Sequence, residues 1–139
     1  MGGLSGRAAH RRERDADQAQ GKLTRYNKSD IIVAWQLSYY SEKVVATVDR
    51  WPTGIRASFL RIVGAMATQG PDIGMPHTRA MGAGLFEVRA KGREGIGRAF
   101  YCTVIGQRIV ILHAIVKKTE KTPAHDLDIA RARQREVKP

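Results

Sequence analysis

The chain has 139 residues, enough for one domain with a buried core and too few for two. Lys and Arg number 24 against 13 Asp and Glu, which gives a net charge of +11. Because like charges repel, this excess does not stabilise a fold; it favours association with nucleic acid or with an acidic protein. No apolar run is long enough to span a membrane, and no secretory signal pattern is present, so we expect a cytoplasmic protein with no membrane contact.

The first 30 residues differ in composition from the rest. They are rich in Gly, Ala, Gln and Arg and show no apolar periodicity. Such a segment cannot bury enough apolar surface to offset the entropy lost on ordering. We therefore predict a basic, flexible N-terminal extension at residues 1–30 and a folded domain at residues 31–139.

The domain is predicted to begin with a strand and two helices. Ile31–Tyr40 is rich in β-branched and aromatic residues and predicts a strand. Ser41 is expected to cap a short helix that ends before Pro52. Thr53 is expected to cap a second helix, whose apolar residues recur at helical spacing up to Gly70. The two helices should form a hairpin that packs on a sheet.

The second half of the domain is predicted to be mainly β-structure. Pro71–Ala83 contains several Gly and Pro residues and predicts an irregular loop, and a two-residue turn is expected at Gly106-Gln107. Three strands are predicted, at Gly84–Lys91, Ile96–Ile105 and Arg108–Val116.

The last predicted strand is apolar on both faces, so it should lie inside the sheet. Thr122 as N-cap and Pro123 in the first turn predict a closing helix that ends near Val137. The predicted order is β-α-α-β-β-β-α, an α+β fold with a mainly antiparallel sheet, a helical hairpin and a C-terminal helix.

Charged residues gather on the predicted sheet. Strand alternation places Glu87, Arg89 and Lys91 together on the face away from the helical hairpin, with Arg98 on the neighbouring strand. Guanidinium groups that converge in this way could hold phosphates bidentately; alternatively, these are solvated charges on an open strand face. Further lysines cluster where the last strand leads into the closing helix: Lys117, Lys118 and Lys121.

Cleavage of RNA by its own 2′-hydroxyl needs a base, an acid and cations around the phosphate. No metal is needed where Arg or Lys supplies the positive charge. The four histidines are not at ligand spacing, and the chain has no Gly-rich phosphate loop and no Ser-nucleophile motif. We therefore expect neither a metal nor a cofactor.

Three residues of types that often take part in catalysis are better explained by packing in the core. Cys102 lies between apolar residues in a predicted strand, so we expect a buried thiol. Because it is the only cysteine, no disulfide can form within the chain. Tyr101 falls on the face opposite Arg98 and predicts a core tyrosine. His113 lies among isoleucines in the last strand and predicts a core histidine with a satisfied ring.

Several stretches of the chain resemble the phage-derived, HigB-like branch of the RelE/ParE toxin superfamily. They are Gly70-Pro71, Gly84–Arg89 (GLFEVR), Arg98–Tyr101 (RAFY), Asp128–Arg133 (DIARAR) and, most distinctively, Ile111–Pro123 (ILHAIVKKTEKTP). The resemblance covers residues 34–137 and implies a RelE-like fold.

The resemblance also implies a function. It implies the toxin of a type II toxin–antitoxin system: a metal-independent mRNA endoribonuclease that acts on the ribosome and is held inactive by a helix-turn-helix antitoxin. Operator DNA would be contacted only through the antitoxin complex. Because one fold can serve several targets, two alternatives stay open: a ParE-like gyrase inhibitor and a catalytically inactive, antitoxin-bound regulatory partner.

The catalytic set follows from the resemblance position by position. Arg89 and Arg98 match cationic catalytic positions of RelE-type toxins, and Lys118 matches a third. Glu87 stands where RelE has Lys, and the catalytic Tyr of RelE falls at Ala124-His125, so the proton-transferring group is left open between His125 and Glu87. Further RNA contacts are expected from four cations: Arg79, Lys91, Lys117 and Lys121.

Overall fold

The computed structural model describes residues 34–117 and 121–138. The predicted N-terminal extension and Lys118 lie outside the described residues. The boundary between extension and domain therefore stays a prediction.

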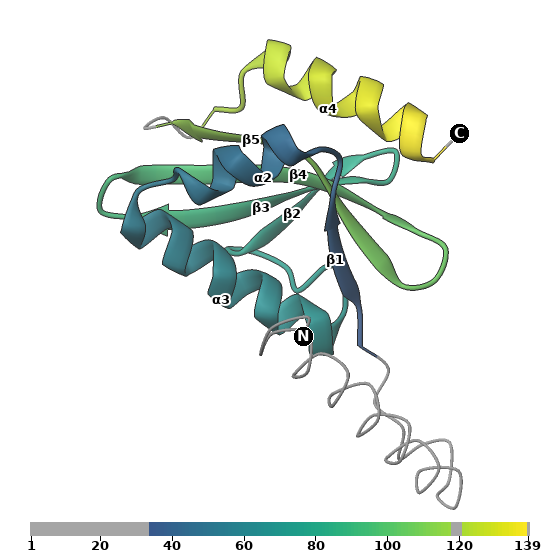
Figure 1. Ribbon diagram of the computed structural model, residues 1–139, viewed down its shortest axis with the longest axis horizontal. Coiled ribbons are helices and arrows are strands. Elements are labelled where there is room, and N and C mark those ends of the chain that lie inside the picture. Colours follow the sequence, from purple (N-terminus) through teal and green to yellow (C-terminus); the bar gives the residue numbers. More distant parts are fainter. Residues whose placement is uncertain (1–33, 118–120, 139) are drawn as a thin grey trace, which may run out of the picture. The chain divides into compact units, whose positions relative to one another are not determined.

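The described chain forms a sheet with helices on both faces (Figure 1). Helices α2 and α3 cover one face, and α4 covers the other. None of the helices in this part of the chain is long and apolar enough to span a membrane. The predicted α+β class, with its helical hairpin and C-terminal helix, is confirmed. The elements in chain order are β1 Gln36–Tyr39, α2 Glu42–Asp49, α3 Thr53–Gln69, β2 Thr78–Gly82, β3 Leu85–Gly92, β4 Gly95–Val104, β5 Arg108–Lys117 and α4 Ala124–Val137.

The five strands lie in the order β1-β5-β4-β3-β2. Strands β2 to β5 form an antiparallel meander, and β1 pairs with β5 in parallel. Strand β5 thus lies between two strands, with Ile109, Ile111 and Leu112 almost fully buried. This confirms the interior position predicted from its two apolar faces.

The larger core lies between the helical hairpin and the sheet. Ile55, Phe59 and Met66 recur on one side of α3 and are fully buried against it. Trp51, in the connection between α2 and α3, meets the edge of the Phe59 ring at a centroid distance of 5.5 Å. At about 1.5–3 kcal/mol for each large apolar side chain removed from water, this stripe holds the hairpin on the sheet.

Two predictions about the meander are wrong. The segment predicted as an irregular loop contains β2. This strand is short and alternates only weakly between apolar and polar residues, and it is formed by pairing with β3. The turn between β4 and β5 has three residues, because Val104 pairs with Arg108. Within this turn, Gly106 and Gln107 both have positive φ.

Of the three predicted helix caps, one is confirmed. The Ser41 hydroxyl accepts a hydrogen bond from the Val44 N–H. Thr53 and Thr122 are not caps, since α3 and α4 begin after Pro52 and Pro123, with no capping side-chain bond from either proline.

Helix α3 receives a cap from a distant part of the chain instead. Glu94, in the turn between β3 and β4, accepts a hydrogen bond from the Gly54 N–H at 3.2 Å. We expect Glu94→Ala to lower the free energy of unfolding by about 1 kcal/mol, the usual contribution of an N-cap, because alanine cannot accept the bond from Gly54. Urea unfolding of the purified variant measures this, with Arg93→Ala, the exposed neighbour in the same turn, as control. Equal losses in the two variants would contradict a capping role.

Candidate functional site

The face of the sheet under α4 carries three rows of residues in register. The first row runs Arg79–Glu87–Phe100–His113 across β2 to β5. The second row contains Arg89, Arg98 and Ile115, and the third contains Lys91, Ile96 and Lys117. The rows place the predicted cations side by side at one end of the sheet, next to the connection into α4.

Glu87 is the buried centre of an ionic cluster, which we call the Glu87 cluster: Arg79, Glu87, Arg89, Arg98 and Thr122. Its Oε1 lies 3.3 Å from Arg79 Nη2, 3.3 Å from Arg98 Nη1 and 3.6 Å from Arg89 Nε. Its Oε2 accepts hydrogen bonds from Arg98 Nη1 at 3.3 Å and from the Thr122 hydroxyl at 3.0 Å. Three guanidinium groups therefore share one carboxylate.

Burial decides what this cluster can do. Glu87 and Arg98 are 0% exposed and Arg89 is 6% exposed, so the alternative of solvated strand-face charges is wrong for these three residues. Arg89 and Arg98 face each other on neighbouring strands, a repulsive arrangement that the carboxylate of Glu87 offsets. In this structure Arg98 directs its guanidinium at the carboxylate of Glu87.

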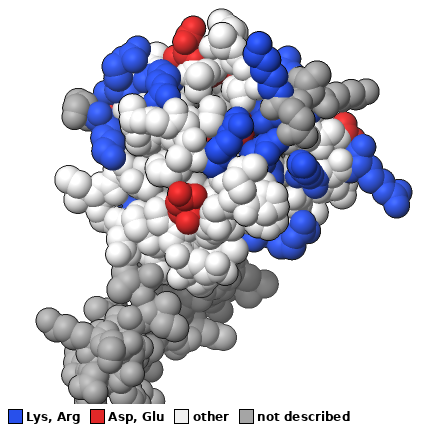
Figure 2. Space-filling view, turned by 180° about the vertical axis from the view of Figure 1, so that it is seen from behind, with Lys and Arg blue, Asp and Glu red and all other residues white. Residues whose placement is uncertain are grey.

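The exposed cations surround this buried centre. The Arg79 side chain is 39% exposed, and Lys91, Lys117 and Lys121 are exposed at the same end of the sheet. Figure 2 shows Lys and Arg side chains gathered over the upper half of one face, with few acidic side chains among them. Because three arginines share the single negative charge of Glu87, the Glu87 cluster has a net positive charge and adds to that of this face.

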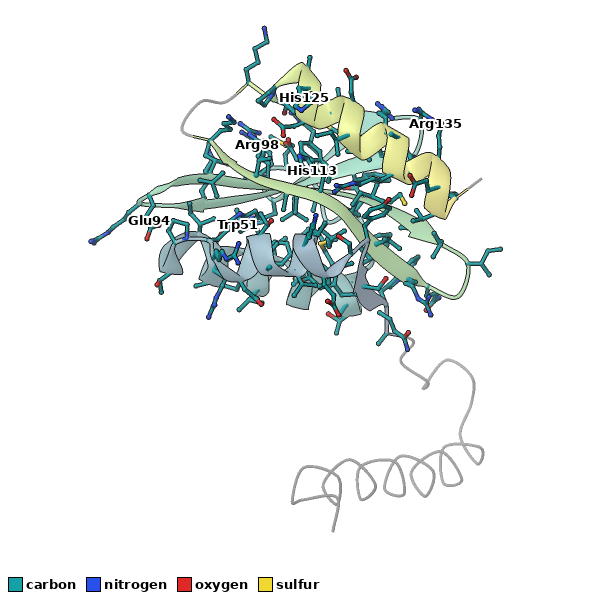
Figure 3. The ribbon with its side chains drawn as sticks, turned by 45° about the horizontal axis from the view of Figure 1, so that its top comes forward. Trp51, Glu94, Arg98, His113, His125 and Arg135 are labelled. Atoms are coloured by element: carbon teal, nitrogen blue, oxygen red, sulfur yellow. The ribbon has the colours of Figure 1, made fainter. Side chains whose placement is uncertain are left out.

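Two histidines lie near the start of α4 (Figure 3). His113 is the core histidine that was predicted: its ring stacks on Phe100, and its Nε2 lies 2.8 Å from Asp126 Oδ1. His125 is exposed in the first turn of α4. Among the described contacts, none joins His125 to the Glu87 cluster.

The other two residues assigned to packing also lie in the core. Tyr101 is fully buried, and its hydroxyl donates to the carbonyl of Pro71; burial, and next the charge of Asp72, raise its pKa. Cys102 is fully buried, and burial raises the pKa of its thiol. A thiol with a raised pKa is a poor nucleophile, so Cys102 is inert.

Two residues of the site were missed by the sequence reasoning. Thr122 was assigned to a helix cap, but its hydroxyl serves the carboxylate of Glu87 instead. Asp126, which binds His113, carried no signal in the sequence, because only the packing of α4 on β5 brings the two together. Within residues 34–117 and 121–138, no three His, Cys, Asp or Glu side chains come close enough to hold a metal ion.

The fold and the site define a small α+β protein with a positively charged sheet end beneath its C-terminal helix. Residues 46–135 match the model of a family described as "Phage derived protein Gp49-like (DUF891)". The chain belongs to this family, which is related to HigB/RelE-like toxins. A search of the curated proteins finds no match to the chain.

Proposed function

We propose that the protein is the toxin of a type II toxin–antitoxin pair and that it cleaves RNA without a metal ion. The observation that carries the proposal is the grouping of Arg79, Lys91, Lys117 and Lys121 around a buried, arginine-rich centre. Cations gathered in this way bind the phosphates of RNA and stabilise the charge that develops during cleavage. The relation of the family to HigB/RelE-like toxins supports the same conclusion.

The proposed roles follow from exposure. Arg79 and the three exposed lysines contact phosphates, since solvent reaches their charged ends. Glu87 and Arg98 are positioning residues that hold Arg79 and Thr122 in place. Arg89, 6% exposed beside them, adds positive charge beneath the phosphate. Lys118, outside the described residues, belongs to the proposed set through its match to RelE-type toxins.

His125 is the better of the two candidates for proton transfer. Both carboxylate oxygens of Glu87 accept hydrogen bonds, and the residue is fully buried, so RNA cannot reach it without a rearrangement. His125 is exposed, and histidine is the side chain that most often serves as a general base or acid. It would take the proton of the 2′-hydroxyl, whose oxygen attacks phosphorus. The bond from phosphorus to the 5′-oxygen then breaks, the 5′-oxygen takes a proton from solvent water, and a 2′,3′-cyclic phosphate remains.

The proposal includes the partners implied by the resemblance. The toxin would act on mRNA at the ribosome in the cytoplasm, and a helix-turn-helix antitoxin would hold it inactive. Contact with operator DNA would occur only through the antitoxin complex.

Expression of the full chain in bacteria without an antitoxin tests the function. We expect growth to stop and mRNA to be cut into fragments with cyclic phosphate ends, while plasmid DNA keeps its supercoiling. Lys91→Gln/Lys117→Gln should restore growth, because it removes two phosphate contacts. Lys43→Gln/Arg50→Gln, which removes the same charge around α2 on the other face of the sheet, should remain toxic.

Two outcomes would contradict the proposal. Intact mRNA with loss of DNA supercoiling would establish the gyrase inhibitor. Normal growth with intact mRNA would favour the inactive regulatory partner, in which the buried pair of Glu87 and Arg98 has a structural role alone.

A further inference from the structure

A second group of cations lies at the C-terminal end of α4, away from the Glu87 cluster. There, a hollow of about 430 Å³ opens between α4 and the turn that joins β2 to β3. Figure 3 shows Arg135 at this end of the helix and His125 at the other. The hollow is lined by Ala83, Arg131, Gln134, Arg135 and Lys138.

Hydrogen bonds between α4 and the turn fix the floor of the hollow. Gly82 and Ala83 have positive φ values of 91° and 52° in this turn. The Arg131 guanidinium donates to the carbonyls of Gly82 and Met81 at 2.8 and 2.7 Å, and the Gln134 amide donates to that of Ala83 at 2.8 Å. Arg131 and Gln134 are therefore held in place by hydrogen bonds, and the exposed Arg135 and Lys138 line the rest of the hollow.

The hollow is positively charged. Arg131, Arg135 and Lys138 line it, and its lining contains no acidic residue. The C-terminus of a helix carries about half a negative charge, which three cations outweigh. Arg135 and Lys138 are exposed, so an anion can reach them from solvent.

We propose that this hollow is an anion site that binds a backbone phosphate of single-stranded RNA. The inference rests on the proposed function, and it adds a contact remote from the cleavage site. Arg135 lies ten positions after His125 in α4, which is about 15 Å at 1.5 Å per residue. One RNA strand laid along α4 would thus be held at both ends, with the bond to be cut near His125.

The lining favours RNA over an acidic segment of a protein partner. Protein interfaces gain most of their affinity from large apolar and aromatic anchors in pockets, and Ala83 is the one apolar residue in the lining. Phosphate binding needs only charge and hydrogen-bond donors, which the guanidinium of Arg135 and the ammonium of Lys138 supply.

The test uses the full chain and an eight-nucleotide single-stranded RNA with 2′-O-methyl ribose, which cannot be cleaved because its 2′-oxygen carries no proton. Dissociation constants are measured over a range of salt concentrations. Arg135→Gln/Lys138→Gln should weaken binding several-fold and lower the slope of log K against log salt by about 0.7 to 1.4, as expected for one to two lost contacts with a single strand. Lys43→Gln/Arg50→Gln, of equal net charge, should change neither quantity.

Three results would overturn the inference: equal losses in the two variants, no binding of the RNA by the unaltered chain, or an unchanged RNA affinity in Arg135→Gln/Lys138→Gln. In the last case, if Arg135→Gln/Lys138→Gln binds poly-glutamate more weakly than the unaltered chain does, the hollow is a site for an acidic protein segment. Cleavage of ordinary RNA is measured separately. Binding that depends on the hollow, without any cleavage, would contradict the proposed function and leave this inference standing.

Discussion

Replacing Glu87 by Gln is expected to destabilise the protein more than the removal of any one arginine around it. Loss of one partner from a buried ion pair typically costs about 3–5 kcal/mol, because a charge is left in a low-dielectric environment. Glu87→Gln removes the carboxylate that Arg79, Arg89 and Arg98 share. Arg98→Met keeps the length of the apolar stem and leaves Glu87 with its other partners, so we expect about half that loss or less.

Urea unfolding of the purified variants measures both free energies. Asp128→Asn on the exposed side of α4 serves as the control for loss of a carboxylate and should change the midpoint little. A larger loss from Arg98→Met than from Glu87→Gln would contradict a centre organised by the carboxylate. An unchanged urea midpoint in Glu87→Gln would exclude any stabilising role for the cluster.

The second large effect is expected at glycines where the β3–β4 hairpin meets the hairpin of helices. A Cβ added at Gly97 would lie 2.5 Å from Ile55 Cγ2 and 2.8 Å from Trp51 Cζ3. A Cβ at Gly92 would lie 2.7 Å from the backbone nitrogen of Ile55, which no side-chain rotation can relieve. We expect Gly97→Ala and Gly92→Ala to cost about 1–3 kcal/mol or more, since overpacking outweighs the entropy gained by replacing glycine in a strand.

Gly64→Ala is the matched control for these two variants. Gly64 lies within α3, and nothing stands within 4 Å of its added Cβ. The same chemical change should therefore raise the free energy of unfolding, by about 1 kcal/mol, because alanine favours the helix. Thermal or urea unfolding shows directly whether each variant is more or less stable than the unaltered chain. A loss of stability in Gly64→Ala, or a gain in Gly97→Ala, would contradict the packing described for this interface.

Strong local patterns made most of the fold predictable. The apolar spacing of Ile55, Phe59 and Met66 predicted α3 and the face it buries, and the doubly apolar β5 predicted its interior position. Strand β2 was missed because Thr78–Gly82 has little pattern of its own and is formed by pairing with β3. The cap of α3 was misassigned because Glu94 reaches it from 40 residues away in the chain.

Which charged residues share one face of the sheet was predictable from the sequence, but their burial and contacts were not. Strand alternation correctly put Glu87 and Arg89 on one face, and in the structure Arg98 lies opposite Arg89. Their burial could not be inferred, because it depends on how α4 packs over that face. For the same reason, the contacts of Thr122 with Glu87 and of Asp126 with His113 became visible only in three dimensions.

The parallel pairing of β1 with β5 has a consequence for the order of folding. The Ser38 hydroxyl bonds to the carbonyl of Ile109, 71 residues away in the chain, whereas β2 to β5 are joined by short turns. Closing a long loop costs entropy before any contact compensates for it, and contacts distant in sequence slow folding. We therefore expect the β2–β5 meander to form first and to serve as the template on which β1 docks, so that the folding rate is set by the arrival of the first strand.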